Sequence, residues 1–188
     1  MGREDFEIIR SNRRTISLEI TSDGRVVVRA PKYMPEADIF SFVESKSVWL
    51  AKYLQKKERD LESLKEEGCF TDQEIKRLYE LAKQVIPEKV AYYARLMRIS
   101  YGRISIRKQK TRWGSCSREG NLNFNCLLMM APPEVLDYVV VHELCHRLEM
   151  NHSAKFWAQV EKMIPDYRKP RKWLKENGSR LMMRADLG

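Results

Sequence analysis

The decisive stretch of this sequence is residues 142–152, which read His-Glu-Leu-Cys-His-Arg-Leu-Glu-Met-Asn-His. On a helix, His142 and His146 leave the same face one turn apart, so both imidazoles can bind one zinc ion. Glu143 points to the side of this pair, where it can accept a proton from an activated water without becoming a ligand. A catalytic zinc needs a third protein ligand, and His152 is the natural candidate because the chain can turn back beneath the metal. All three histidines of the chain lie in this window, and the pattern therefore predicts a zinc centre with Glu143 as general base.

A purely structural interpretation of the same residues is also open. The histidines would then be core residues, and Glu143 would form an ion pair with Arg147 one helical turn further on. For a single histidine this interpretation is the better one, whereas three histidines and a glutamate at ligand spacing favour the metal. Cys145 lies between the two helical histidines on the far side of the helix, and we expect it to be a small core residue.

Length and composition place the chain among globular proteins. Its 188 residues, 43% of them hydrophobic, are enough for one domain with a real core. The sequence contains no apolar run long enough to span a membrane and no apolar signal-peptide core at its start. Its four cysteines form no Cys-x-x-Cys pair, which fits reduced thiols. We therefore expect a soluble, cytoplasmic protein without a membrane partner.

The net charge of +9 is unevenly distributed. Residues 95–120 contain eight basic residues and one acidic residue. A basic surface close to the expected metal favours an anionic partner, such as a nucleic acid, a nucleotide or an acidic protein. Solubility alone is the alternative explanation, and the charge does not choose among these partners.

The first part of the chain predicts a hairpin followed by a long helix. Residues 15–20 alternate between polar and apolar side chains, residues 25–30 are rich in valine, and the Asp23-Gly24 step between them favours a tight turn. From Glu36 the apolar residues recur at helical spacing, and the helix is expected to continue through the charged residues up to Gly68.

The second part predicts three further helices and two short strands before the last helix. A helix over residues 71–97 should be kinked or interrupted at Pro87. Short strands are expected around Ile104–Ile106 and Leu122–Phe124, joined by a basic loop in which Gly114 allows a sharp turn. The nearly all-apolar helix that begins at Pro132-Pro133-Glu134 should lie in the core, and Ser153 should cap the next helix. A last short helix should open near Pro170 and close at Asn177-Gly178.

Several of these motifs occur together in one known family. They are Arg13–Leu18 with Asp23-Gly24, Lys110-Thr111-Arg112-Trp113-Gly114-Ser115-Cys116, Ala131–Glu134, Tyr138–His146 and Asn151–Trp157. With them the chain resembles the YgjP-like family of small zinc metallopeptidases, relatives of the WLM and SprT-like proteins, over nearly its whole length.

The resemblance implies an α+β, zincin-like metallopeptidase domain with an N-terminal β-hairpin, a small antiparallel sheet and a buried metal-binding helix. It implies one domain over residues 1–188, with the hairpin and helix in residues 1–70 and the core with the metal site in residues 71–188. The same resemblance implies that His142, His146 and His152 bind Zn²⁺ and that Glu143 is the general base.

Three functions follow as hypotheses. The first is a zinc-dependent metallopeptidase whose peptide or protein substrate adds as a strand to the edge near Asn121–Phe124. Its transition-state stabiliser would come from Tyr167, Arg112 or Arg147.

The second hypothesis is hydrolysis of a nucleoside triphosphate (UTP) to monophosphate and pyrophosphate, an activity ascribed to YgjP-like proteins. Lys110 and Arg112 of the basic loop would then bind the triphosphate. The third is a nucleic-acid-associated protease, as for the SprT-like relatives, and it ranks last because the chain shows no recognisable DNA-binding motif.

Overall fold

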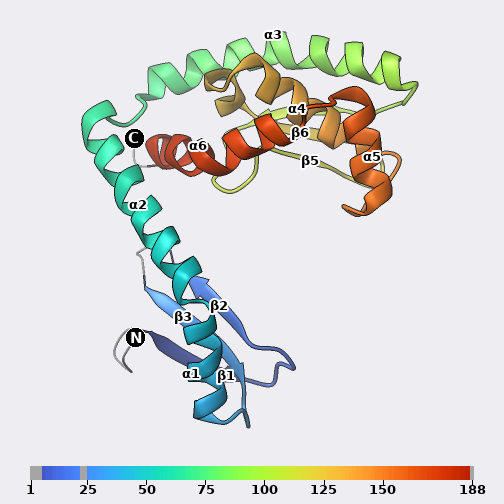
Figure 1. Ribbon diagram of the computed structural model, residues 1–188. Coiled ribbons are helices and arrows are strands. Elements are labelled where there is room, and N and C mark those ends of the chain that lie inside the picture. The colour runs from blue at the N-terminus through green and yellow to red at the C-terminus, as the bar shows by residue number, and fades with distance from the viewer. Residues whose placement is uncertain (1–5, 22–24, 187–188) are drawn as a thin grey trace. The chain divides into compact units, whose positions relative to one another are not determined.

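The computed structural model describes residues 6–21 and 25–186. The chain divides into two compact units, Met1–Glu62 and Ser63–Gly188. Six α-helices and two small three-stranded sheets are present among the described residues, which confirms the α+β class (Figure 1). The expectation of a single domain with its core from residue 71 stays a prediction.

The first unit is built on a sheet with the strand order β1-β3-β2. Its strands are β1 (Glu7–Ser11), β2 (Ser17–Ile20) and β3 (Val26–Pro31). β2 and β3 are antiparallel, so the predicted hairpin is confirmed, while its expected turn at Asp23-Gly24 lies outside the described residues. β1 was not predicted, and it pairs with β3 in parallel.

Helices α1 (Glu36–Ser45) and α2 (Ser47–Glu67) follow the sheet. The sequence predicted one continuous helix here, but the chain breaks at Lys46, where the backbone N–H bonds to the Val43 carbonyl as in a tight 3₁₀-type turn. Side chains from β3, α1 and the start of α2 form the small core of this unit, including Val28, Ala30, Ile39, Val43 and Leu50.

The second unit begins with the last residues of α2 and continues into α3 (Asp72–Met97), a long helix with a complete capping box between Thr71 and Glu74. Pro87 does not interrupt it. The carbonyl group that loses its hydrogen bond belongs to Lys83, an exposed residue, so the loss falls on the solvent side of the helix. Gly68, at φ +71°, separates α3 from α2.

The sheet of the second unit has the order β4-β6-β5, from β4 (Ile104–Arg107), β5 (Gly114–Cys116) and β6 (Leu122–Asn125). It is mixed and not purely antiparallel as expected, because β4 runs parallel to β6. The sequence analysis placed β5 in a loop. A short turn over residues 117–121 folds β5 back onto β6, so β4 is left to pair with the opposite edge.

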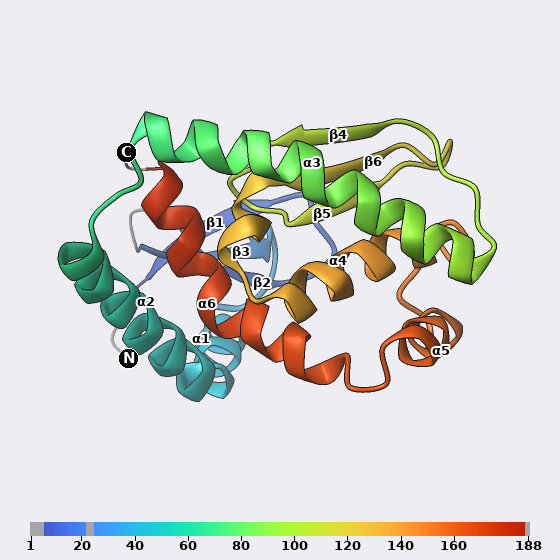
Figure 2. The same cartoon turned by 90° about the horizontal axis from the view of Figure 1, so that it is seen from above.

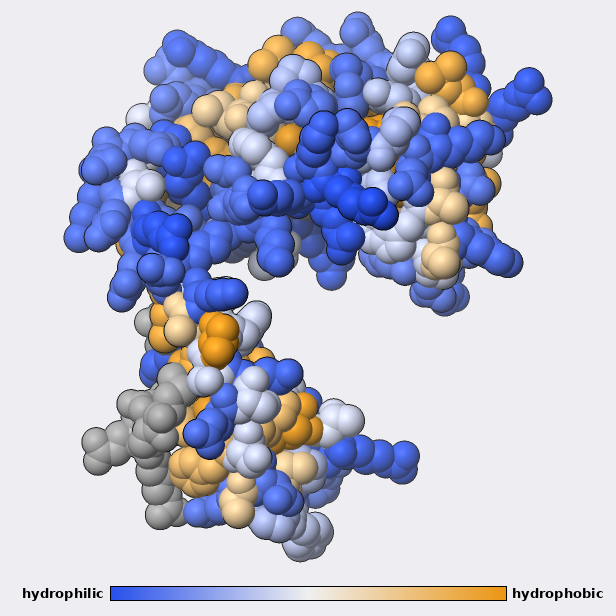
Figure 3. Space-filling model, in the orientation of Figure 1, coloured by the Kyte–Doolittle hydropathy of each residue, from blue (hydrophilic) through white to orange (hydrophobic). Residues whose placement is uncertain are grey.

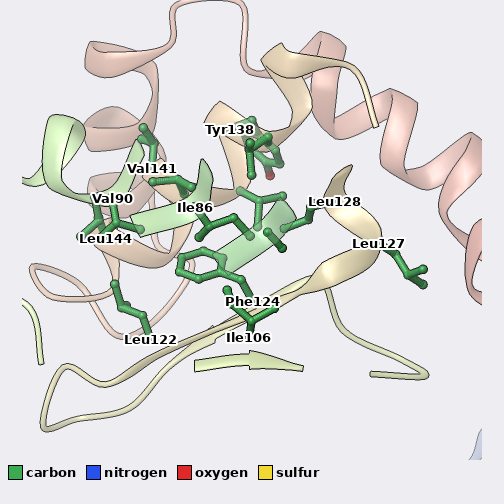
Figure 4. Packing of buried hydrophobic residues seen from close by; sticks show 14 of the residues in the cluster. Ile86, Val90, Ile106, Leu122, Phe124, Leu127, Leu128, Tyr138, Val141 and Leu144 are labelled. Carbon is green, nitrogen blue, oxygen red and sulfur yellow. The ribbon is translucent and has the colours of Figure 1, made fainter. Parts of the chain in front are cut away.

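The 3₁₀ helix η1 (Cys126–Met130) leads into α4 (Pro133–Cys145), which lies between α3 and α6 (Arg168–Asp186) in Figure 2. Ile106 and Phe124 point from the sheet toward Ile86 of α3 and Val141 of α4 (Figure 4). This contact makes α4 the centre of the main core, as its all-apolar sequence predicted.

The last helix is longer than predicted. The sequence predicted its end at Asn177-Gly178, but α6 runs through these residues to Asp186. A Cβ atom on Gly178 would lie 3.0 Å from Nε1 of Trp113, so this glycine allows the indole ring to pack directly on the helix. The glycine therefore marks a close approach and not a helix end.

The visible face of the second unit is largely hydrophilic (Figure 3), in keeping with the 32% of charged residues in the chain. None of the helices in the described part of the chain is long and apolar enough to span a membrane.

Asn125, at the end of β6, is fully buried and fixes the loop between β4 and β5. Its amide nitrogen donates to the carbonyl oxygens of Gln109 (2.8 Å) and Arg112 (3.0 Å), and its amide oxygen accepts from the Leu127 N–H (3.2 Å). The loop conformation therefore depends on one side-chain amide.

Asn125→Asp should consequently destabilise the protein by about 3 kcal/mol at neutral pH, because a carboxylate would face two carbonyl oxygens that lose their donor. Urea denaturation measures this loss. Asn123→Asp is the matched control on the same strand, since the Asn123 amide bonds only to the Ser115 hydroxyl at a less buried position. Equal losses in the two variants would contradict the role of Asn125.

Candidate metal centre

His142 and His146 project from the end of α4. His142 lies in the last turn, and His146 caps the helix with φ −65° and ψ −14°, which continues the helical path by one residue. The two imidazole centroids are 5.0 Å apart. The predicted one-turn spacing on a shared face is confirmed.

His152 reaches the same place from the start of the next helix, α5 (Ala154–Met163). Ser153 caps α5 by accepting a hydrogen bond from the Phe156 N–H, as predicted, and this fixes the residue that precedes it. The Nε2 atoms of His152 and His142 are 3.0 Å apart. The ligand atoms of all three histidines lie within 4.8 Å of one another.

Phe156 packs against all three imidazoles. Its ring centroid is 4.9 Å from that of His142 and 4.7 Å from those of His146 and His152. The phenyl ring is fully buried, so it forms an apolar support beneath the cluster. Trp157 adds a second support, because its ring stacks on His152 at 5.7 Å and 25°.

The protonation states suit metal binding. Burial lowers the pKa of His142 to about 3, with further lowering by His146, His152 and the Arg171 charge, and burial also lowers the pKa of His146. His146 Nδ1 lies 3.2 Å from the Glu149 carbonyl oxygen, so a proton on Nδ1 leaves the Nε2 lone pair free. Neutral imidazoles with free lone pairs are the form that binds a metal ion.

The spacing of the donor atoms also fits a small cation. Two nitrogens at about 2.0–2.1 Å from a tetrahedral zinc would be roughly 3.3 Å apart. The 3.0 Å between the Nε2 atoms of His142 and His152 is close to this value. In the metal-free chain a proton on one Nε2 can be donated to the other, and a metal ion between the two nitrogens would take the place of that proton.

Glu143 is almost completely buried beside the cluster. A Cβ atom on Gly114 of β5 would lie 2.7 Å from Cγ and Oε1 of Glu143, so the strand backbone packs directly on this side chain. Gly114 therefore permits a close approach of the strand to Glu143, whereas the sequence predicted that this glycine allows a sharp turn. Burial raises the pKa of Glu143 to about 8, and the positive charge of Arg112 opposes this shift.

The alternative ion pair between Glu143 and Arg147 is not formed. Arg147 instead donates from Nε to the Ser100 carbonyl (3.2 Å) and from Nη1 to the Arg118 carbonyl (2.9 Å). Arg147 thus stabilises the loops around β5, and this structural role speaks against its being a transition-state stabiliser.

The remaining predicted site residues differ in how they are engaged. Lys110 forms an ion pair with Asp186 at the end of α6. Arg112 is exposed, and its charge reaches Glu143. Tyr167 is buried and stacks on Trp157 at 5.3 Å.

Arg171 was missed by the sequence analysis. Its guanidinium lies 4.4 Å from the centre of the Trp157 ring, and its charge lowers the pKa of His142. The sequence offered no signal for this residue, because it belongs to α6 and reaches the histidines only through tertiary packing.

Comparisons with known proteins found one family model and similar solved structures. A family model described as "YgjP-like, metallopeptidase domain" matches residues 14–78 and 71–177. The metallopeptidase zymogen abylysin of Pyrococcus abyssi shares 19% identity, with a TM-score of 0.45 over 48% of this chain and 93% of its own. The corresponding values for the metallopeptidase zymogen jannalysin of Methanocaldococcus jannaschii are 21%, 0.45, 50% and 97%. No curated protein matches the chain.

The low pKa of His142 predicts how the stability of the metal-free protein depends on pH. The folded state holds this imidazole neutral down to a pKa of about 3, whereas the unfolded chain takes up the proton near its ordinary pKa of about 6.5. The unfolded state therefore takes up this proton between these values, and the contribution of His142 to stability should fall as the pH drops below about 6.5. Glu143 acts in the opposite direction, because its raised pKa lets the folded state hold a proton that the unfolded chain releases.

Urea denaturation in the presence of a chelator, between about pH 7 and pH 5, measures this loss. From pH 7 to pH 5 the parent should lose stability relative to His142→Gln, because both proteins keep Glu143 and only the parent carries the imidazole that titrates in the unfolded state. The same pH dependence in both proteins would contradict the assignment.

Proposed function

Because the chain belongs to the YgjP-like metallopeptidase family, we propose that it is a zinc-dependent peptidase whose metal ligands are His142, His146 and His152. The observation that carries this proposal is the convergence of three imidazoles, with ligand atoms within 4.8 Å of one another, beside a buried carboxylate. Imidazole is a preferred ligand of zinc, and three protein ligands leave a position open for chemistry.

Zinc, when bound, would supply a water with a pKa lowered to about 7 and would polarise the carbonyl group of the substrate. The protein provides the rigid support for it. Two ligands stand on the core helix α4, the third begins α5, and Phe156 packs beneath all three.

Glu143 acts as the general base in this proposal. It follows His142 directly on α4, and its carboxylate accepts no hydrogen bond from the described residues, so its lone pairs are available for a proton. Burial favours the protonated acid and holds its pKa at about 8 in the metal-free chain. A nearby dication would shift this pKa downward, toward values at which a carboxylate can take a proton from water and return it to a leaving amine.

The substrate backbone would bind to β5. The sequence analysis placed this edge near Asn121–Phe124, which is wrong, because β6 is the central strand and is paired on both sides. β5 is an edge strand, and its Gly114 packs on Glu143. An extended peptide that adds to β5 would therefore lie next to the general base.

The two alternative functions stay predictions. For hydrolysis of a triphosphate, the support from the basic loop is reduced, because Lys108 donates to the Ala185 carbonyl (2.8 Å) and Lys110 pairs with Asp186. Of the predicted triphosphate-binding residues, only Arg112 is left with an unengaged side chain. A nucleic-acid-associated protease has no specific contact in its favour.

We expect the purified protein to bind about one zinc ion per chain, and His146→Ala to remove most of it, because a site reduced to two ligands loses both affinity and geometry. Metal content after gel filtration measures this. Cys145→Ala is the matched control, since the neighbouring thiol is buried in the core and is not part of the histidine cluster. Undiminished zinc in a triple variant of His142, His146 and His152 would overturn the site.

Glu143→Gln should keep zinc and fold but lose at least about a hundredfold in turnover of an unstructured protein such as casein, because the nearly isosteric amide cannot accept the proton. Metal content and the circular dichroism spectrum establish that site and fold are intact. Turnover at the parent rate would show that Glu143 has only a structural role. Release of pyrophosphate from UTP that depends on Glu143 would favour the nucleotide alternative.

A further inference from the structure

Arg171 lies one aromatic ring away from the histidine cluster. It occupies the first turn of α6, and its guanidinium packs 4.4 Å from the centre of the Trp157 ring. That ring stacks on His152 at 5.7 Å and lies 5.9 Å from His142. The cation–π contact restrains the guanidinium and leaves its N–H donors free.

Arg112 approaches the same centre from the loop before β5. The Asn125 amide holds the Arg112 carbonyl at 3.0 Å, and Gly114, two residues further on, packs against Glu143. The backbone of Arg112 is therefore fixed close to the general base, while its side chain is exposed.

The neighbouring lysines differ from these two arginines in having acidic partners. Lys110 pairs with Asp186, Lys169 with Asp166 (2.8 Å), and Lys172 with Glu176 (3.7 Å). Among the described residues, no carboxylate pairs with Arg112 or Arg171. Arg112 and Arg171 therefore differ from these three lysines in offering guanidinium groups that no described carboxylate occupies.

We infer that Arg112 and Arg171 bind a carboxylate of the substrate and that the site prefers peptides with an acidic group next to the bond to be cleaved. A guanidinium group matches a carboxylate with two parallel hydrogen bonds, and a neutral peptide backbone offers it no such partner. The carboxylate could be an acidic side chain or the C-terminus of the peptide. This inference rests on the proposed peptidase function and names its substrate class.

The test measures binding separately from turnover, with the zinc-loaded Glu143→Gln protein. The probes are alanine peptides of equal length with a neutral fluorophore: one with a central glutamate and an amidated end, one with a central glutamine and an amidated end, and one with a central glutamine and a free C-terminal carboxylate. Fluorescence anisotropy gives the Kd of each. Comparison of the Kd values of the first and third peptides shows whether the site prefers an acidic side chain or a C-terminal carboxylate.

A carboxylate peptide should bind about five- to tenfold more tightly than the amidated glutamine peptide, as expected for two solvent-exposed charge contacts. Adding Arg171→Gln or Arg112→Gln to the same protein should reduce this ratio, and the double substitution should bring it close to one. Raising the salt concentration should also reduce it, because exposed charges are screened.

Lys172→Gln is the matched control. It removes the same charge from the same helix, next to Arg171, but from a side chain that already has a partner. Its binding ratio should equal that of the parent. A reduction as large as in Arg171→Gln would mean that only the overall charge matters, and the inference would be wrong.

The inference is also wrong if both peptides with a carboxylate bind only as tightly as the amidated glutamine peptide, or if none of the three peptides binds. Tight binding of UTP that depends on both arginines, while the peptides show no carboxylate preference, would contradict it as well.

Turnover by the zinc-loaded parent separates this inference from the proposed function. Equal kcat/KM for the glutamate and glutamine peptides would overturn the carboxylate preference and leave the peptidase standing. Carboxylate-dependent binding without cleavage of any peptide would contradict the proposed peptidase function and would still support the binding of a carboxylate by Arg112 and Arg171.

Discussion

The contact on which the candidate centre depends is the packing of three imidazoles around the ring of Phe156. Each histidine comes from a different point of the chain path: the last turn of α4, its cap, and the residue before the cap of α5. Only the placement of α5 against α4 brings the third one back, and the fully buried Phe156 is the side chain that makes this contact. Because α4 is packed between α3, α6 and the sheet, two of the three ligands stand on the buried core helix of the second unit.

Burial has opposite effects on the two kinds of group in this centre, and both effects favour a cation. It lowers the pKa of His142 to about 3 and raises that of Glu143 to about 8, so the metal-free centre carries little charge at neutral pH. The Nε2 atoms of His142 and His152 lie 3.0 Å apart, so in the metal-free chain a proton on one of them can be donated to the other. A dication would take the place of that proton and stabilise the ionised carboxylate at the same time, which would offset part of the cost of desolvating the site.

The sequence predicted the features that depend on local spacing. The shared helical face of His142 and His146, the cap at Ser153 and the antiparallel pairing of β2 with β3 each follow from residues close together in the chain. The features it did not predict depend on partners far away in sequence. The sequence predicted a helix end at Gly178, but this glycine allows Trp113 to pack on the helix. It predicted a turn at Gly114, but this glycine allows Glu143 to pack against the strand.

The basic loop shows why a count of charges cannot locate a binding site. Residues 95–120 carry a clear excess of positive charge in the sequence, yet two of the lysines in this stretch are used within the fold. Lys108 and Lys110 hold the end of α6, and Arg147, from outside this stretch, ties down the loops around β5. Arg112, whose backbone is fixed by Asn125, and Arg171, which comes from a different helix, are restrained close to the centre and have no acidic partner among the described residues. A charged residue becomes available for a ligand when the fold restrains it without giving it an acidic partner, and this property is decided by tertiary contacts that the composition does not record.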